Sequence, residues 1–257
     1  LKFEGKAKKN AKDAEVANLK MAKLLQEARD RKKARKAEKA RKEAEPKSQK
    51  DDSAVEEDDS AVEESKSFFD ACREGNVDVV RLLLAMPDID VNKANDDGDT
   101  PLYIACWRGH VAVVRLLLAR KDIDVNRAKK DGETPLYITC EKGHVDVVRL
   151  LLARKEIQIN QAKEGGATPL YITCQQGHVD VLRLLLARKD ILINQAKEKG
   201  TTPLYITCEK GHVDVVQLLL ARKEIQINQA MEGGFTPLYV TCQNGHVDVV
   251  RLLLDQK

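Results

Sequence analysis

Cysteine and histidine, the residues in this chain best suited to nucleophilic or metal chemistry, recur at a fixed spacing of 34 residues. A nucleophile or a metal ion needs unlike side chains that converge at one point, whereas this spacing distributes like side chains along the chain. Packed helices lie about 8–10 Å apart, too far for a disulfide, which needs Cα atoms within about 7 Å. We therefore interpret both sets as packing residues and expect no catalytic residue, no metal ligand, no cofactor and free thiols. The two sets are Cys72, Cys106, Cys140, Cys174, Cys208 and Cys242, and His110, His144, His178, His212 and His246.

The elements that must position these residues follow from the same period. The segment from Thr134 to His144 has near-copies that begin at Thr100, Thr168, Thr202 and Thr236. A fixed period of 34 residues without insertions predicts a solenoid, in which each unit packs on its neighbours.

Each unit predicts two helices and a loop. In the unit 131–164, Thr134 is a suitable N-cap, Pro135 suits the first helical position, and Gly143 ends the first helix. Residues 145–152 predict a second helix with a broad apolar face. The turn-rich connection that follows predicts a projecting hairpin-like loop, and we expect the Asn before it to hold the turn through side-chain-to-backbone bonds. These residues are Asn92, Asn126, Asn160, Asn194 and Asn228.

The repeated motifs resemble the ankyrin repeat from about Glu63 to Lys257. They are Gly-x-Thr-Pro-Leu-Tyr, then Gly-His-Val-Asp-Val-Val-x-Leu-Leu-Leu, then Ile/Val-Asn. The resemblance implies helix pairs stacked in a curved array with β-hairpin tips along one edge, and protein binding through a concave face made by those tips and the first helices. We therefore expect an all-α solenoid of ankyrin-like helix-turn-helix repeats with β-hairpin-like loops, preceded by a long charged helix and a disordered acidic linker.

The chain departs from the family pattern in several places. The usual Gly after the second helix is missing and one residue is added, which gives the period of 34. The usual His after Thr-Pro-Leu is Tyr here, which must alter whatever hydrogen bond that His makes. The Asp common in the family's hairpin is also replaced. The replacements are Tyr103, Tyr137, Tyr171, Tyr205 and Tyr239 at the His position, and Asn95, Lys129, Lys163, Lys197 and Met231 at the Asp position.

The predicted organisation has three parts: a basic Ala/Lys/Arg/Glu-rich helix (1–45), an acidic disordered linker (46–65) and a repeat domain (66–257). Residues 1–50 carry 18 Lys and Arg against 8 Asp and Glu, and residues 51–65 carry 8 acids and no base. The repeat units are 63–96, 97–130, 131–164, 165–198, 199–232 and an incomplete 233–257. In the first unit, Ser67, Phe68 and Phe69 replace Pro, Leu and Tyr, which is typical of a capping repeat.

The basic helix has a thin apolar stripe, too weak to establish a coiled coil. Its run 29–42 fits a solvated helix best, because no aromatic residue is interleaved for base stacking. A nuclear import signal or a phosphate-binding strip is the alternative. The sequence contains no run of about 18 apolar residues and no secretion signal. We therefore expect no membrane span and a cytoplasmic protein, with the nucleus as the alternative.

Candidate binding residues are sought where the units differ, because packing positions should be alike and surface positions are free to vary. These differences fall at the hairpin tips and at the ends of the first helices, which the ankyrin resemblance assigns to partner contact. Trp107 and Phe235 stand out, since binding hot spots favour large aromatic residues, but packing against a neighbouring unit explains them equally well. The predicted partner-binding residues are Asp96, Asp97, Asp99, Trp107, Arg108, Lys130, Asp131, Glu133, Glu141, Lys142, Glu164, Gln175, Gln176, Glu198, Lys199, Glu209, Lys210, Glu232, Phe235, Gln243 and Asn244.

These observations predict a non-catalytic scaffold, a monomeric array whose concave face binds a protein partner. One alternative is an adaptor whose basic N-terminal helix binds nucleic acid or an anionic membrane surface. Another is the interaction segment of a larger enzyme. The identity of the partner does not follow from near-identical repeats, because fold does not determine function.

Overall fold

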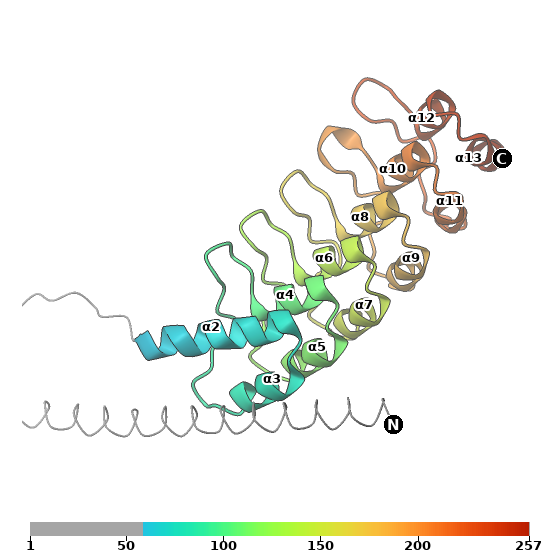
Figure 1. Cartoon of the computed structure of the whole chain (residues 1–257). Helices are drawn as coiled ribbons and strands as arrows, with labels where there is room; N and C mark the ends of the chain where they lie inside the picture. Colours follow the sequence, from blue (N-terminus) through green and yellow to red (C-terminus); the bar gives the residue numbers. More distant parts are fainter. Residues whose placement is uncertain (1–58, 257) are drawn as a thin grey trace, which may run out of the picture.

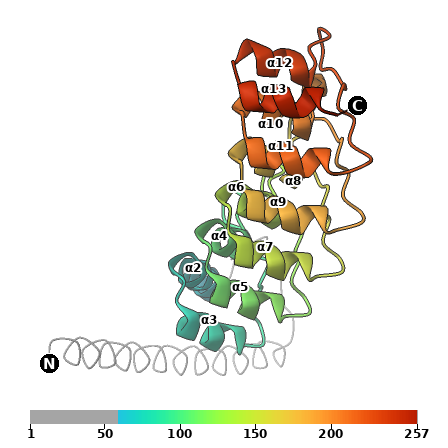
Figure 2. The same ribbon diagram turned by 90° about the vertical axis from the view of Figure 1, so that its right-hand side faces the viewer.

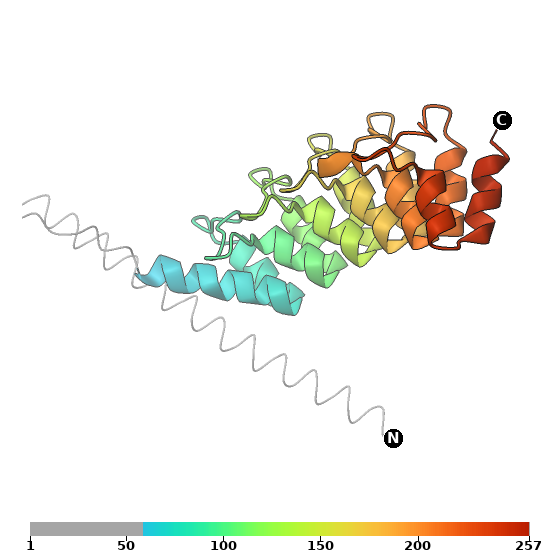
Figure 3. The same cartoon turned by 90° about the horizontal axis from the view of Figure 1, so that it is seen from above.

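The computed structural model describes residues 59–256 as two layers of short helices in one curved row (Figure 1). The first helices of the six units are α2 (Asp59–Glu74), α4 (Pro101–Arg108), α6 (Pro135–Lys142), α8 (Pro169–Gln176), α10 (Pro203–Lys210) and α12 (Pro237–Gln243). The second helices are α3 (Val77–Leu84), α5 (Val111–Leu118), α7 (Val145–Leu152), α9 (Val179–Leu186), α11 (Val213–Leu220) and α13 (Val247–Leu254). Figure 2 shows the second helices as a ladder on the outer face. Figure 3 shows the loops projecting along one edge.

The helix boundaries predicted from Thr, Pro and Gly are confirmed. In the unit that contains α6, Thr134 Oγ1 accepts a hydrogen bond from the Tyr137 backbone N–H at 3.1 Å, and Pro135 is the first helical residue. Gly143 ends the helix in the left-handed conformation, with φ at 73°. The same caps recur in the units around it, so the first helices are set by local sequence.

The hairpin-like loops close through tight turns, and the described residues contain no β-strand. In one loop, the N–H of Lys129 donates to the carbonyl of Glu133 and the N–H of Gly132 donates to that of Lys129, both at 3.0 Å. Neighbouring tips are joined, since the Glu164 N–H donates to the Asp131 carbonyl at 2.9 Å. A turn of the 3₁₀ type, η1 (Glu198–Gly200), forms the tip before α10.

The N-terminal boundary of the repeat domain differs from the prediction. Helix α2 begins at Asp59 and therefore takes in residues 59–65, which the sequence analysis assigned to the disordered linker. These residues contain neither Gly nor Pro and run directly into the packed part of α2. Extending an existing helix costs far less than nucleating one, which explains the longer helix. The predicted basic helix 1–45 and residues 46–58 of the linker lie outside the described residues.

The histidines join each unit to the one before it. His144 Nε2 lies 3.1 Å from the carbonyl oxygen of Trp107, and its ring packs beside Gly109. A Cβ atom at Gly109 would lie 2.8 Å from that ring. The Gly of one unit therefore leaves room for the His of the following unit. The same contact to a preceding carbonyl is made by His110, His178, His212 and His246.

Arginine and asparagine side chains make further bonds between units. Arg120 Nη1 donates to the Leu84 carbonyl at 3.0 Å, which supplies a partner to one of the carbonyls left free at the end of α3. Asn92 donates to the Asp122 carbonyl at 2.7 Å and accepts from the Asp124 N–H at 2.8 Å. Asn126, Asn160 and Asn194 make the same pair of side-chain-to-backbone bonds. These bonds reach the next unit and do not stay within the local turn.

The Gly-His contact provides a first test. Gly143 and Gly245 share a φ near 74°, but a Cβ at Gly143 would lie 2.8 Å from the His178 ring, whereas one at Gly245 meets nothing within 4 Å. We expect Gly245→Ala to lower the free energy of unfolding by about 1–2 kcal/mol, the cost of the left-handed conformation alone. Gly143→Ala should cost about 1–3 kcal/mol more through overpacking. Urea denaturation of both variants measures the difference, and equal losses would contradict the contact.

The burial of each cysteine depends on whether a following unit packs against it. Cys72, Cys106, Cys140, Cys174 and Cys208 are free and buried, as predicted for packing residues, but Cys242 is free and exposed. Burial raises the pKa of the Cys106 and Cys140 thiols to about 12. The thiolate is the reactive form, so the buried thiols should be inert in the folded chain.

We expect one cysteine, Cys242, to react rapidly with 5,5′-dithiobis(2-nitrobenzoate) in the folded chain, and all six to react after unfolding. Absorbance of the released thionitrobenzoate measures both. Cys242→Ser should abolish the rapid phase. Rapid reaction of a further thiol in that variant would mean that the units open readily.

Candidate functional site

The loop tips and the first helices lie on the inner side of the curved array (Figure 1). Most of the predicted partner-binding residues are accessible there. The exposed ones are Asp96, Asp97, Arg108, Lys130, Lys142, Glu164, Gln176, Glu198, Lys199, Lys210, Glu232, Phe235, Gln243 and Asn244. The half-buried ones are Asp99, Trp107, Asp131, Glu141, Gln175 and Glu209.

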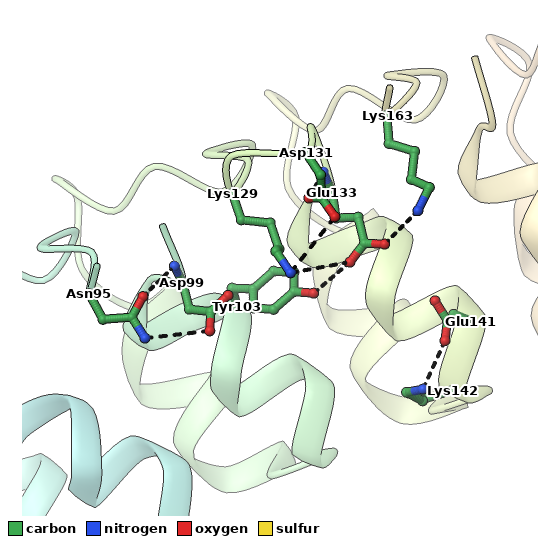
Figure 4. A network of polar contacts seen from close by, with 9 residues as sticks. All are labelled: Asn95, Asp99, Tyr103, Lys129, Asp131, Glu133, Glu141, Lys142 and Lys163. Atoms are coloured by element: carbon green, nitrogen blue, oxygen red, sulfur yellow. Dashed lines mark hydrogen bonds and ion pairs between the residues drawn. The ribbon is translucent and has the colours of Figure 1, made fainter. Parts of the chain in front are cut away.

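Glu133 is the exception among them, because it is buried and bound within the chain (Figure 4). Its Oε2 accepts from the Tyr103 hydroxyl at 2.8 Å, and its Oε1 pairs with Lys163 Nζ at 2.8 Å. Lys129 Nζ lies further away, at 4.0 Å. A carboxylate is buried only where it is paired and hydrogen-bonded. Glu133 therefore ties α4 to the loops that precede α6 and α8, and its carboxylate is occupied within the chain.

The network sets the protonation states of its members. Burial, followed by the hydrogen bond to Glu133, raises the pKa of Tyr103 far above its usual value. The hydrogen bond from Lys163 to Glu133 raises the pKa of the lysine. Near neutral pH, Tyr103 therefore remains a hydrogen-bond donor and Lys163 remains a cation.

Lysines of the loops lie over tyrosine rings of the first helices. Lys129 Nζ is 5.6 Å from the ring centre of Tyr103. Lys163 Nζ is 5.2 Å from that of Tyr137, and Lys197 Nζ is 5.3 Å from that of Tyr171. Such cation–π contacts contribute about 0.5–2 kcal/mol.

Sequence analysis recorded the tyrosines and these lysines only as departures from the family pattern, and it missed their pairing. The signal was present, since Lys stands at one position in three successive units and Tyr at another in five. The two positions come together only when one unit packs on the next.

The two aromatic candidates have different surroundings. Trp107 is half-buried and packs against the core, and the Arg108 guanidinium carbon lies 4.2 Å from its ring centre. Phe235 is 41% exposed, and its ring lies 4.9 Å from that of Tyr239. Trp107 thus contributes to packing while part of its surface stays accessible, whereas Phe235 is part of an open aromatic pair.

Family comparisons match almost the whole described array. The family "Ankyrin repeats (3 copies)" matches residues 121–197 and 189–257, and "Ankyrin repeats (many copies)" matches residues 68–118. The chain belongs to the ankyrin repeat family. Ankyrin repeats are in general modules of protein–protein interaction. The comparison with curated proteins returns no match.

Between residues 59 and 256, no helix has the length and hydropathy needed to cross a bilayer. The same part of the chain contains no group of three or more His, Cys, Asp or Glu residues placed to hold a metal ion.

The role of Glu133 can be tested by comparing Glu133→Gln with Glu164→Gln. The first substitution removes the charge that Lys163 contacts, while Glu164 is exposed at a loop tip. We expect Glu133→Gln to lower the free energy of unfolding by about 1–2 kcal/mol, and Glu164→Gln to change it by less than about 0.5 kcal/mol. Chemical denaturation at low salt measures both. A loss that is equal in the two variants would contradict the network.

Proposed function

We propose that this ankyrin repeat chain is a non-catalytic scaffold that binds a protein partner along its inner face. The observation that carries the proposal is the division of labour between identical and varied residues. The identical His, Arg and Asn residues are occupied by bonds between units. Most of the varied residues at the loop tips and first-helix ends are exposed or half-buried, so they are the ones available to a partner.

Aromatic residues near the two ends of this face supply candidate anchors. Trp107 with Arg108 lies at the end of α4, and Phe235 with Tyr239 lies at the last unit. Tyrosine, tryptophan and arginine are enriched among residues that dominate binding energy. Between them lie charged and amide side chains such as Lys142 and Gln176, which suit a polar rim.

A second candidate function rests on the basic composition of residues 1–50, with 18 Lys and Arg against 8 Asp and Glu. These residues lie outside the described part, and the candidate is an adaptor that binds nucleic acid or an anionic membrane through them. For each phosphate contact, the logarithm of the association constant falls by about 0.9 when the salt concentration rises tenfold. A steep loss of affinity with salt would therefore favour this second candidate over the scaffold.

Affinity capture with the full chain, followed by binding measurements with the recovered protein, tests the scaffold. We expect Trp107→Ala to weaken binding by about 2 kcal/mol or more and to lower the melting temperature modestly, because the ring also packs against the core. Arg149→Ala is the matched control and should bind normally, because Arg149 is an exposed residue of α7, which belongs to the outer row of helices (Figure 2). A large drop in melting temperature without loss of affinity would assign Trp107 to the core. Loss of binding in Arg149→Ala alone would place the partner on the outer face.

A further inference from the structure

The Glu133 network is a template for what the inner face can bind. It consists of the Tyr103 hydroxyl of α4, the Glu133 carboxylate of the loop before α6 and the Lys163 ammonium of the loop before α8 (Figure 4). The corresponding set lies 34 residues further along the chain, with Tyr137 and Lys197 in the places of Tyr103 and Lys163. The carboxylate is missing from that second set, because Ala167 stands where Glu133 does.

The two donors of the second set remain in place without the carboxylate. Within the part of the chain that the structure describes, Lys197 forms no ion pair and the Tyr137 hydroxyl makes no hydrogen bond, while Tyr137 is 3% exposed. The Lys197 ammonium is 5.3 Å from the ring centre of Tyr171, much as the Lys163 ammonium is 5.2 Å from that of Tyr137. The repeat geometry therefore holds both ammonium groups in the same way.

The surroundings of the second set also suit an incoming carboxylate. The first helix of this unit ends in the neutral pair Gln175 and Gln176, whereas its neighbours end in Glu141 with Lys142 and in Glu209 with Lys210. Ala167 has only a methyl group at this position and is 8% exposed, so the chain supplies no acceptor there. Lys197 thus has no ion-pair partner, and the end of α8 carries no acid that could compensate it.

We propose that Tyr137 and Lys197, above Ala167, form a binding site for the carboxylate of an Asp or Glu side chain of a protein partner. The proposal rests on the proposed function and specifies the chemistry of the partner. A polyanion such as nucleic acid suits this face less well, because Glu164, Glu198 and Glu209 would repel its other phosphates. A single carboxylate needs only the two donors.

The site can be filled within the chain, which tests it without a partner. We expect Ala167→Glu to raise the midpoint of thermal unfolding by about 2–4 °C relative to Ala167→Gln, because only the former supplies a charge to Lys197. The gain should vanish when Lys197→Met is added to both. A midpoint for Ala167→Glu equal to or below that of Ala167→Gln would overturn the proposal.

A random dodecapeptide library displayed on phage and selected on the full chain supplies the ligand. Selected peptides should share an Asp or Glu whose amide replacement weakens binding about tenfold or more. Ala167→Glu and Lys197→Met should each weaken binding of the parent peptide to a similar extent, but not that of its amide variant. Peptides that bind Ala167→Glu as tightly as the original chain would overturn the site. The site would also be overturned by a single-stranded oligonucleotide that displaces bound peptide from the original chain but not from Ala167→Glu.

A triple alanine variant of Lys142, Gln176 and Lys210, which are exposed at successive first-helix ends, separates the two proposals. Peptides that lose affinity for this variant but not for Ala167→Glu leave the inner face as the binding surface and overturn the carboxylate site. Peptides that bind all of these variants normally and are lost with Arg149→Ala overturn the proposed function as well.

Discussion

The stacking of each unit on the next is the interaction on which the whole structure depends. A pair of eight-residue helices cannot bury an apolar face by itself, so the core exists only between units. In an inner unit, Val147, Val148 and Leu151 are completely buried. In the last unit, the outer positions lose this cover, and Tyr239, Val247 and Leu254 are each about half exposed, at 49%, 58% and 57%.

Polar contacts between the units add direction to this apolar stacking. A hydrophobic contact tolerates rotation and sliding, whereas a hydrogen bond requires a defined distance and angle. Three kinds of hydrogen bond act at separate points of a junction. Examples are His144 with the Trp107 carbonyl, Arg120 with the Leu84 carbonyl, and Asn92 with the Asp122 carbonyl of the following unit. Because the same residues return in nearly every unit, the junctions are alike, and the array forms one curved row with its loops on the inner side (Figure 1).

This regularity gives meaning to the positions where it is broken. Position 133 and its counterparts read Asp99, Glu133, Ala167, Thr201 and Phe235 along the array. Glu133 satisfies a tyrosine and a lysine within the chain, which favours stability, while Ala167 leaves the equivalent donors for another molecule. Phe235 instead extends an aromatic surface with Tyr239. A single variable position can thus produce an internal ion pair, an open polar site and an apolar platform on one scaffold.

The sequence by itself determined the period, which follows from the recurrence of the motif every 34 residues. It also determined the two helices of each unit and their caps, because helices and caps depend on residues close together in the chain. Thr134, Pro135 and Gly143 act on their own helix, and their roles could be predicted without knowing the fold. Only the tertiary structure decided the roles of His144, Asn92 and Glu133, whose partners lie 30 to 37 residues away. It also decided that α2 extends back to Asp59. Whether a charged side chain at position 133 is a free contact or a buried link depends on which groups the neighbouring units bring to it, and that is set by packing.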